Sequence, residues 1–85
     1  MKEFKYVITD AEGIHARPAG ELVKVAKEFS SKSTIIKDGK SGDCKKIFGV
    51  MALAVKCGNE VTITVEGEDE EAAAAKIEEF MKSNM

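Results

Sequence analysis

The sequence predicts an α+β fold in which three helices cover one face of a four-stranded, mainly antiparallel sheet. Segments in which apolar and polar residues alternate indicate four strands, and segments with apolar residues three or four positions apart indicate three helices. The elements follow the order strand, helix, strand, strand, helix, strand, helix. A ferredoxin-like arrangement shares the first six elements, so the pattern predicts the fold class and leaves the strand order open.

The first half of the chain predicts a strand, a helix and a hairpin. Residues 2–9 alternate between apolar and polar side chains, which is typical of a strand with one buried face. Residues 16–29 predict a helix, and Pro18 fits its first turn, where the N–H that proline lacks has no intrahelical partner. Residues 33–37 and 40–43 predict two strands joined by the turn Asp38-Gly39, and the second is short and polar enough for a sheet edge. The apolar stripe of the helix comprises Ala16, Ala19, Leu22, Val23, Ala26 and Phe29.

The second half predicts a short helix, a strand and a longer helix. Residues 47–55 form an apolar run that predicts a helix with Gly58 just past its last turn, although a buried strand fits the same run. Residues 61–65 alternate strictly and predict the fourth strand. Residues 70–82 predict a helix whose acidic first turn and basic last turn match the helix dipole. Its inward residues are Ala73, Ile77, Phe80 and Met81.

Composition excludes several classes of protein. We expect the 85 residues to form one domain, residues 1–85. Hydrophobic residues make up 44% and charged residues 33%, a balance that excludes intrinsic disorder. The net charge of -2 leads us to expect no nucleic acid partner. The chain has no apolar run of about 18 residues, so we expect no membrane insertion and a cytoplasmic location.

The residues that most often carry chemistry are few. Cys44 and Cys57 have no CxxC spacing, and we expect both to be reduced thiols that serve as small, buried or half-buried apolar residues. With one histidine and two cysteines, the chain offers no recognisable ligand set, so we expect no metal and no cofactor. The single histidine and the single proline lie three positions apart, at His15 and Pro18, which directs attention to that segment.

Residues 13–19 combine three features that favour phosphoryl chemistry. The unpaired N–H groups at the start of a helix attract anions, and Ala16, Arg17 and Pro18 form that start. The same positive end favours a neutral, nucleophilic His15, and the Arg17 guanidinium can donate to phosphoryl oxygens. Together they indicate a transiently phosphorylated histidine. The alternative is that His15 only caps the helix and that Arg17 is a solvated side chain, and spacing alone does not exclude it.

Two motifs in register give the chain a family resemblance. Residues 13–19 resemble the active-centre motif of the histidine-containing phosphocarrier (HPr) family of the bacterial phosphoenolpyruvate-dependent sugar phosphotransferase system. Residues 47–51, followed by 58–61, resemble its second-helix signature, and the resemblance extends over essentially the whole chain. It implies an open-faced β-sandwich with a four-stranded antiparallel sheet covered on one side by three helices. It also implies that His15 accepts a phosphoryl group on Nδ1 from phosphorylated enzyme I and passes it to enzyme IIA components, with Arg17 assisting.

The resemblance further implies a partner-binding surface beside the histidine. Ile47, Phe48 and Met51 match an apolar docking patch, and lysines can surround it with positive charge that suits the acidic surfaces of the family's partners. The alternative is that Ile47 and Met51 are core residues and that the lysines form a solvated face. The docking surface, as named from here on, comprises Gly20, Lys24, Lys27, Lys46, Ile47, Phe48 and Met51.

One position departs from the family pattern. HPr proteins of many Gram-positive bacteria carry a serine at the position of Lys46, and an ATP-dependent HPr kinase phosphorylates it. A lysine cannot accept that phosphate as an O-ester, so the kinase is a doubtful partner unless another serine, such as Ser41, substitutes. Serine would also cap the following helix, whereas Lys46 offers no acceptor and adds positive charge there.

We therefore expect a phosphoryl carrier that shuttles between two enzymes and is not a stand-alone catalyst. The presence of His15 and Arg17 favours this function. The alternative is a regulatory interaction module of the same fold, which binds target proteins according to its phosphorylation state. Lys46 and an unusual Gly20 inside the first helix keep this alternative open.

Overall fold

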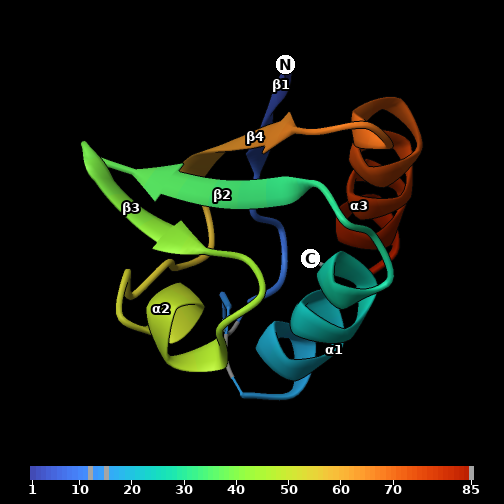
Figure 1. The fold of residues 1–85 in the computed structure, drawn as a ribbon. Helices are drawn as coiled ribbons and strands as arrows, with labels where there is room; N and C mark the ends of the chain where they lie inside the picture. Colours follow the sequence, from blue (N-terminus) through green and yellow to red (C-terminus); the bar gives the residue numbers. More distant parts are fainter. Residues whose placement is uncertain (12, 15, 85) are drawn as a thin grey trace.

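The computed structural model describes residues 1–11, 13–14 and 16–84. Over these residues the elements occur in the predicted order, and the helices cover one face of the sheet while the other face stays uncovered (Figure 1). The predicted α+β open-faced sandwich is confirmed. The elements are β1 (Lys2–Val7), α1 (Ala16–Lys27), β2 (Lys32–Lys37), β3 (Lys40–Asp43), α2 (Ile47–Met51), β4 (Glu60–Glu66) and α3 (Glu70–Asn84).

The four strands form one antiparallel sheet in the order β1-β4-β2-β3. The last strand in the sequence therefore lies between the first and the second. In the middle of the sheet Ile63 of β4 pairs with Phe4 of β1 on one side and with Ile35 of β2 on the other. The short, polar strand β3 lies at the edge, as predicted.

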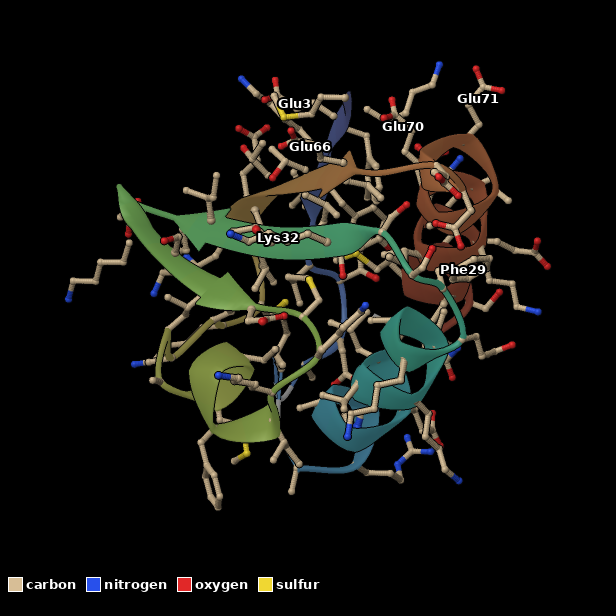
Figure 2. The ribbon with its side chains drawn as sticks, viewed as in Figure 1. Glu3, Phe29, Lys32, Glu66, Glu70 and Glu71 are labelled. Carbon is tan, nitrogen blue, oxygen red and sulfur yellow. The ribbon has the colours of Figure 1, made fainter. Side chains whose placement is uncertain are left out.

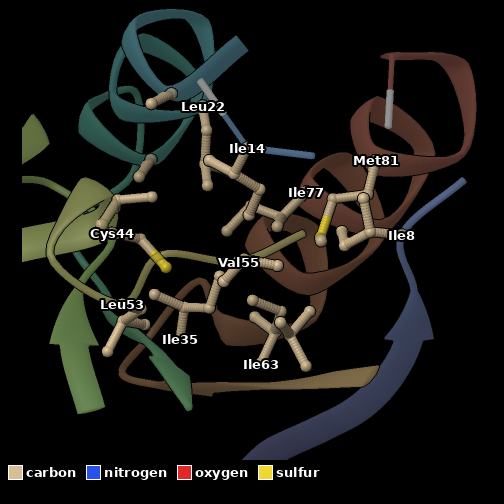
Figure 3. Packing of buried hydrophobic residues seen from close by; sticks show 14 of the residues in the cluster. Ile8, Ile14, Leu22, Ile35, Cys44, Leu53, Val55, Ile63, Ile77 and Met81 are labelled. Carbon is tan, nitrogen blue, oxygen red and sulfur yellow. The ribbon is translucent and has the colours of Figure 1, made fainter. Parts of the chain in front are cut away.

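The core lies between the inner face of the sheet and the helices (Figure 3). Strict alternation places Val61, Ile63 and Val65 of β4 inward, and each is 0% exposed. Leu22 of α1 and Ile77 of α3 meet them from the helical layer and are fully buried as well. Fully buried apolar side chains are the dominant favourable contribution to folding, so this layer contact holds the helices in place.

The stripe predicted for α1 needs two corrections. Ala16 is exposed, because side chains in a helix lean toward the N-terminus and that of the first residue points past the helix end. Val23 is only half-buried, and Val25, three positions after Leu22, packs against the core instead. In α3 the predicted inward residue Phe80 is half-buried and packs against the core.

The helix predicted over residues 47–55 is wrong in length, because α2 ends at Met51. The Ala54 N–H donates to the Met51 carbonyl at 3.0 Å, and Ala54 has a φ of 51°, a left-handed conformation that ends the helix. Gly58 lies outside this helix end, and its N–H donates to the Ile8 carbonyl at 2.8 Å in the turn before β4. The other predicted elements agree with the observed bounds to within two residues.

Candidate functional site

The segment that leads into His15 is fixed against the turn that follows α2. The Ile14 N–H donates to the Val55 carbonyl at 3.0 Å, and the Ile14 side chain is 7% exposed in the core. Gly13 has a φ of 69°, and a Cβ added to it would overlap the Val55 carbonyl oxygen and lie 2.7 Å from Lys56 Cα. Only glycine fits this position, since it needs both a left-handed backbone and the space that a Cβ would fill.

The candidate phosphate-binding residues form the first turn of α1. His15 and Glu12 lie outside the described residues, and their neighbours in the chain define the site. Ala16 and Arg17 are exposed, whereas Pro18, in the first turn of the helix, is buried. Proline fixes its own φ near the helical value, so it stabilises this first turn. The structure thus presents the start of a helix of 12 residues, with its free N–H groups, next to the position of the histidine in the chain.

The docking surface lies where α1 and α2 pack side by side (Figure 1). Phe48 is 84% exposed and Met51 is 39% exposed, which is unusual for large apolar side chains. The alternative interpretation is that Ile47 and Met51 are core residues. It is partly correct for Ile47, which is half-buried and packs against the core, and wrong for Met51, which is exposed. Lys24, Lys27 and Lys46 are exposed. Gly20 is half-buried, and a Cβ added to it would lie in ordinary contact range of the tip of Ile47.

Lys46 occupies the N-cap position of α2. Its backbone is extended, with a φ of -127° and a ψ of 115°, and its side chain makes no capping hydrogen bond. The extended backbone is the conformation that serine, threonine or aspartate adopts when it caps a helix. The position therefore has the geometry of a cap and lacks the acceptor oxygen.

We expect Lys46→Ser to raise the free energy of unfolding by about 0.5–2 kcal/mol, because the hydroxyl can accept a hydrogen bond from a free N–H of α2. Lys46→Ala removes the same lysine without supplying an acceptor and is the matched control. Urea unfolding of both variants and the wild type measures the difference. Equal stability of the serine and alanine variants would contradict the expected capping.

A group of acidic side chains lies near the start of α3. Figure 2 shows Glu3, Glu66, Glu70 and Glu71 at the end of the molecule where α3 begins, away from α2. The N-terminal ammonium group lies 2.8 Å from the Glu70 carboxylate, and its hydrogen bond lowers the pKa of that carboxyl. Basic groups lie among these carboxylates as well, since Lys2 Nζ lies 3.5 Å from the Glu71 carboxylate and Lys32 pairs with Glu66 across the sheet.

The two cysteines occupy different environments, and both are free thiols. Cys44 is fully buried, and loss of solvation raises its pKa to about 12, so it stays a neutral apolar group. Cys57 is exposed, which corrects the expectation that both would be buried or half-buried, because it lies in the turn between α2 and β4. Within the described residues no group of side chains that suits a metal ion occurs, and no helix has the length and apolar character to cross a membrane.

Sequence reasoning missed the wall of the site that Val55 and Lys56 form against Gly13. In the sequence these two residues only mark the end of the apolar run of residues 47–55, and that run predicts a helix rather than a turn that contacts Gly13. No local sequence pattern predicts a contact between two segments that are so far apart along the chain. The one available signal is Gly13, because a glycine before a helix start indicates a turn or a close backbone approach.

Comparison with known protein families identifies the family that shares this fold and the motif of residues 13–19. A family model described as the phosphorylation site of the HPr component of the phosphotransferase system matches residues 2–83. The chain belongs to the HPr family. A phosphocarrier protein HPr of Mycoplasma capricolum is 47% identical to it over 81 residues, which cover 95% of this chain and 91% of the relative.

Solved structures of HPr-family proteins have the same fold as this chain. A mycoplasma histidine-containing phosphocarrier protein superposes with a TM-score of 0.94 at 45% identity, with 96% of this chain and 93% of the other covered. The Bacillus subtilis catabolite repression protein Crh, described as a domain-swapped dimer, gives a TM-score of 0.79 at 38% identity, with 100% and 98% covered. HPr membership confirms the resemblance and makes the chain a phosphocarrier of the phosphotransferase system, whose partners are components of that system.

Proposed function

We propose that His15 receives a phosphoryl group from phosphorylated enzyme I and passes it to sugar-specific enzyme IIA components. The observation that carries this proposal is the motif of residues 13–19, which begins α1 and lies inside the segment matched by the family model. In each transfer one bond to phosphorus forms as another breaks. A ring nitrogen of His15 attacks the phosphorus, the bond between phosphorus and the donor breaks, and the second transfer reverses these roles.

The first turn of α1 stabilises the transferred group in this proposal. The free N–H groups at the helix start and the Arg17 guanidinium donate to the phosphoryl oxygens, where negative charge accumulates during transfer. Ala16 and Pro18 hold the backbone of that turn. Since Arg17 is exposed, its side chain can reach a group held between two proteins.

Both partners bind the docking surface in turn. Phe48 and Met51 supply exposed apolar contact area, and the exposed lysines Lys24, Lys27 and Lys46 attract an acidic partner. One flexible, apolar surface with a charged rim suits two successive partners. We place the protein in the cytoplasm and assign both binding events to a single domain, residues 1–85.

The mass of the intact protein after incubation with enzyme I and phosphoenolpyruvate tests the proposal. We expect the wild type to gain one phosphoryl group that is lost in acid, as phosphohistidine is. His15→Ala should gain none. A folded wild-type protein that stays unmodified beside active enzyme I would contradict the proposed function.

A regulatory interaction module is the second candidate, and the similarity to the catabolite repression protein Crh favours it. The carrier has the stronger support, because the relative with 47% identity is a phosphocarrier protein. Lys46 also argues against regulation by HPr kinase, since the lysine side chain cannot form a phosphoserine. An unmodified protein that binds a different set of targets would transfer the preference to the regulatory module.

A further inference from the structure

Lys37 has an unusual position for a lysine. It is the last residue of β2, and strand alternation places it on the helix-covered face, together with Ser33 and Ile35, which are 2% and 0% exposed. Its own side chain is half-buried. Inward positions of a sheet with one covered face normally carry apolar residues, so a lysine there calls for a specific partner.

The partners of Lys37 are two carbonyl groups of the turn that ends α2. Its Nζ donates to the Leu53 carbonyl at 3.2 Å and to the Ala54 carbonyl at 3.0 Å. An ammonium group has three donors, and hydrogen bonds from a charged donor are stronger than those between neutral groups. Ala54 is in the left-handed conformation, which costs an alanine free energy, so these hydrogen bonds hold a turn that its own backbone does not favour.

This turn leads directly to the residue on which the active-centre segment rests. The next carbonyl along the chain, that of Val55, accepts the Ile14 N–H at 3.0 Å, and Gly13 packs against the same peptide group. Three successive carbonyls are therefore engaged, two by Lys37 and the third by the residue that precedes His15. A displacement of the turn must be transmitted to Ile14, because its side chain is buried and its N–H has this partner.

We propose that Lys37 is a positioning residue for phosphoryl transfer, acting through the turn of residues 53–55 on the backbone of Ile14. This inference rests on the proposed role of His15. Lys37 does not touch the transferred group in this mechanism. It fixes the direction from which the chain enters the active centre, and small misplacements of reacting groups lower transfer rates strongly.

Two variants of Lys37 and one control test the inference in the full-length chain. Lys37→Met keeps most of the aliphatic stem and removes the donors, whereas Lys37→Arg keeps a charged donor. Lys40→Met is the control, because Lys40 lies opposite Lys37 in the hairpin, is exposed, and has a side chain that makes no hydrogen bond or ion pair among the described residues. It removes the same charge a short distance away.

The first readout is amide hydrogen exchange at Ile14, with Ile63 in the middle of the sheet as the internal reference. We expect Lys37→Met to raise the Ile14 exchange rate about tenfold with Ile63 unchanged, because only the local turn loosens. The second readout is the enzyme I reaction with phosphoenolpyruvate. We expect kcat to fall about tenfold and KM to stay within about twofold, since the docking surface is intact. Lys37→Arg should restore both readouts.

Several outcomes overturn the inference. The inference is wrong if Lys37→Met behaves like Lys40→Met in both readouts. It is also wrong if Lys37→Met raises exchange at Ile14 and Ile63 equally, because that result marks a general loss of stability. If Lys37→Met does not fold, Lys37→Gln gives the same comparison, because its shorter side chain cannot span both carbonyls. If the wild type itself takes up no phosphoryl group, the proposed function fails and the inference fails with it, whereas normal wild-type transfer with unchanged variants rejects the inference alone.

Discussion

Gly13→Ala is expected to lower the free energy of unfolding by about 2–4 kcal/mol. Two costs add at this position. A φ of 69° is unfavourable for any residue with a Cβ, and the added Cβ would overlap the Val55 carbonyl oxygen, which is backbone and cannot rotate away. Urea unfolding measures the loss. The rate of phosphoryl uptake should fall as well, because relief of the overlap must move the segment that precedes His15.

Gly58→Ala is the matched control for this loss. Gly58 also has a positive φ, of 89°, and a Cβ there would meet no heavy atom within 4 Å. The control therefore carries the backbone cost alone, and the difference between the two variants measures the overlap with Val55. If Gly13→Ala were no less stable than Gly58→Ala, the close approach of residues 13 and 55 would be wrong.

Phe48→Ala is expected to lower the efficiency of phosphoryl transfer about 10- to 30-fold while changing the free energy of unfolding by less than about 0.5 kcal/mol. The side chain is 84% exposed, so truncation removes little buried area from the folded protein. In a complex the same side chain would be desolvated, and aromatic side chains at the centre of an interface carry much of the binding energy. Steady-state transfer to an enzyme IIA, together with urea unfolding, measures both effects.

Val7→Ala serves as the control for Phe48→Ala. Val7 is 47% exposed, and alternation in β1 directs it to the uncovered face of the sheet, away from α1 and α2. Its truncation removes exposed apolar area without touching the docking surface, and transfer should be unchanged. A larger loss of stability than of transfer in Phe48→Ala would assign Phe48 to the fold rather than to binding.

Sequence patterns predicted the elements of this fold wherever burial and conformation have the same period. Residues 61–65 are the clearest case, because every second residue is apolar and all the apolar ones are buried. The run of residues 47–55 shows where the reasoning fails. Leu53 and Val55 are 6% and 3% exposed, yet they follow the helix rather than belong to it. A continuous apolar run reports burial, and it does not distinguish a helix from a buried turn.

The site was less predictable than the fold. The histidine, the arginine and the helix start are adjacent in the sequence, so elementary electrostatics alone predicts phosphoryl chemistry for them. The predicted docking role of Phe48 rests on family resemblance alone, because the sequence pattern of an apolar residue in an apolar run favours a core position. The sequence marks Lys37 only as a strand end, because its hydrogen bonds to Leu53 and Ala54 depend on how the turn after α2 packs in the folded chain.

The central place of β4 has a consequence for how the molecule forms. Among the described residues β1 pairs only with β4, and β2 pairs with β3 and β4, so a chain without residues 60–66 keeps no more of the sheet than one hairpin. Completion of the sheet then requires contacts between distant parts of the chain, so the folding transition should be all-or-none. The segment of residues 13–14 rests on Val55, just ahead of β4, so we expect it to be fixed only once the chain around residue 55 has packed.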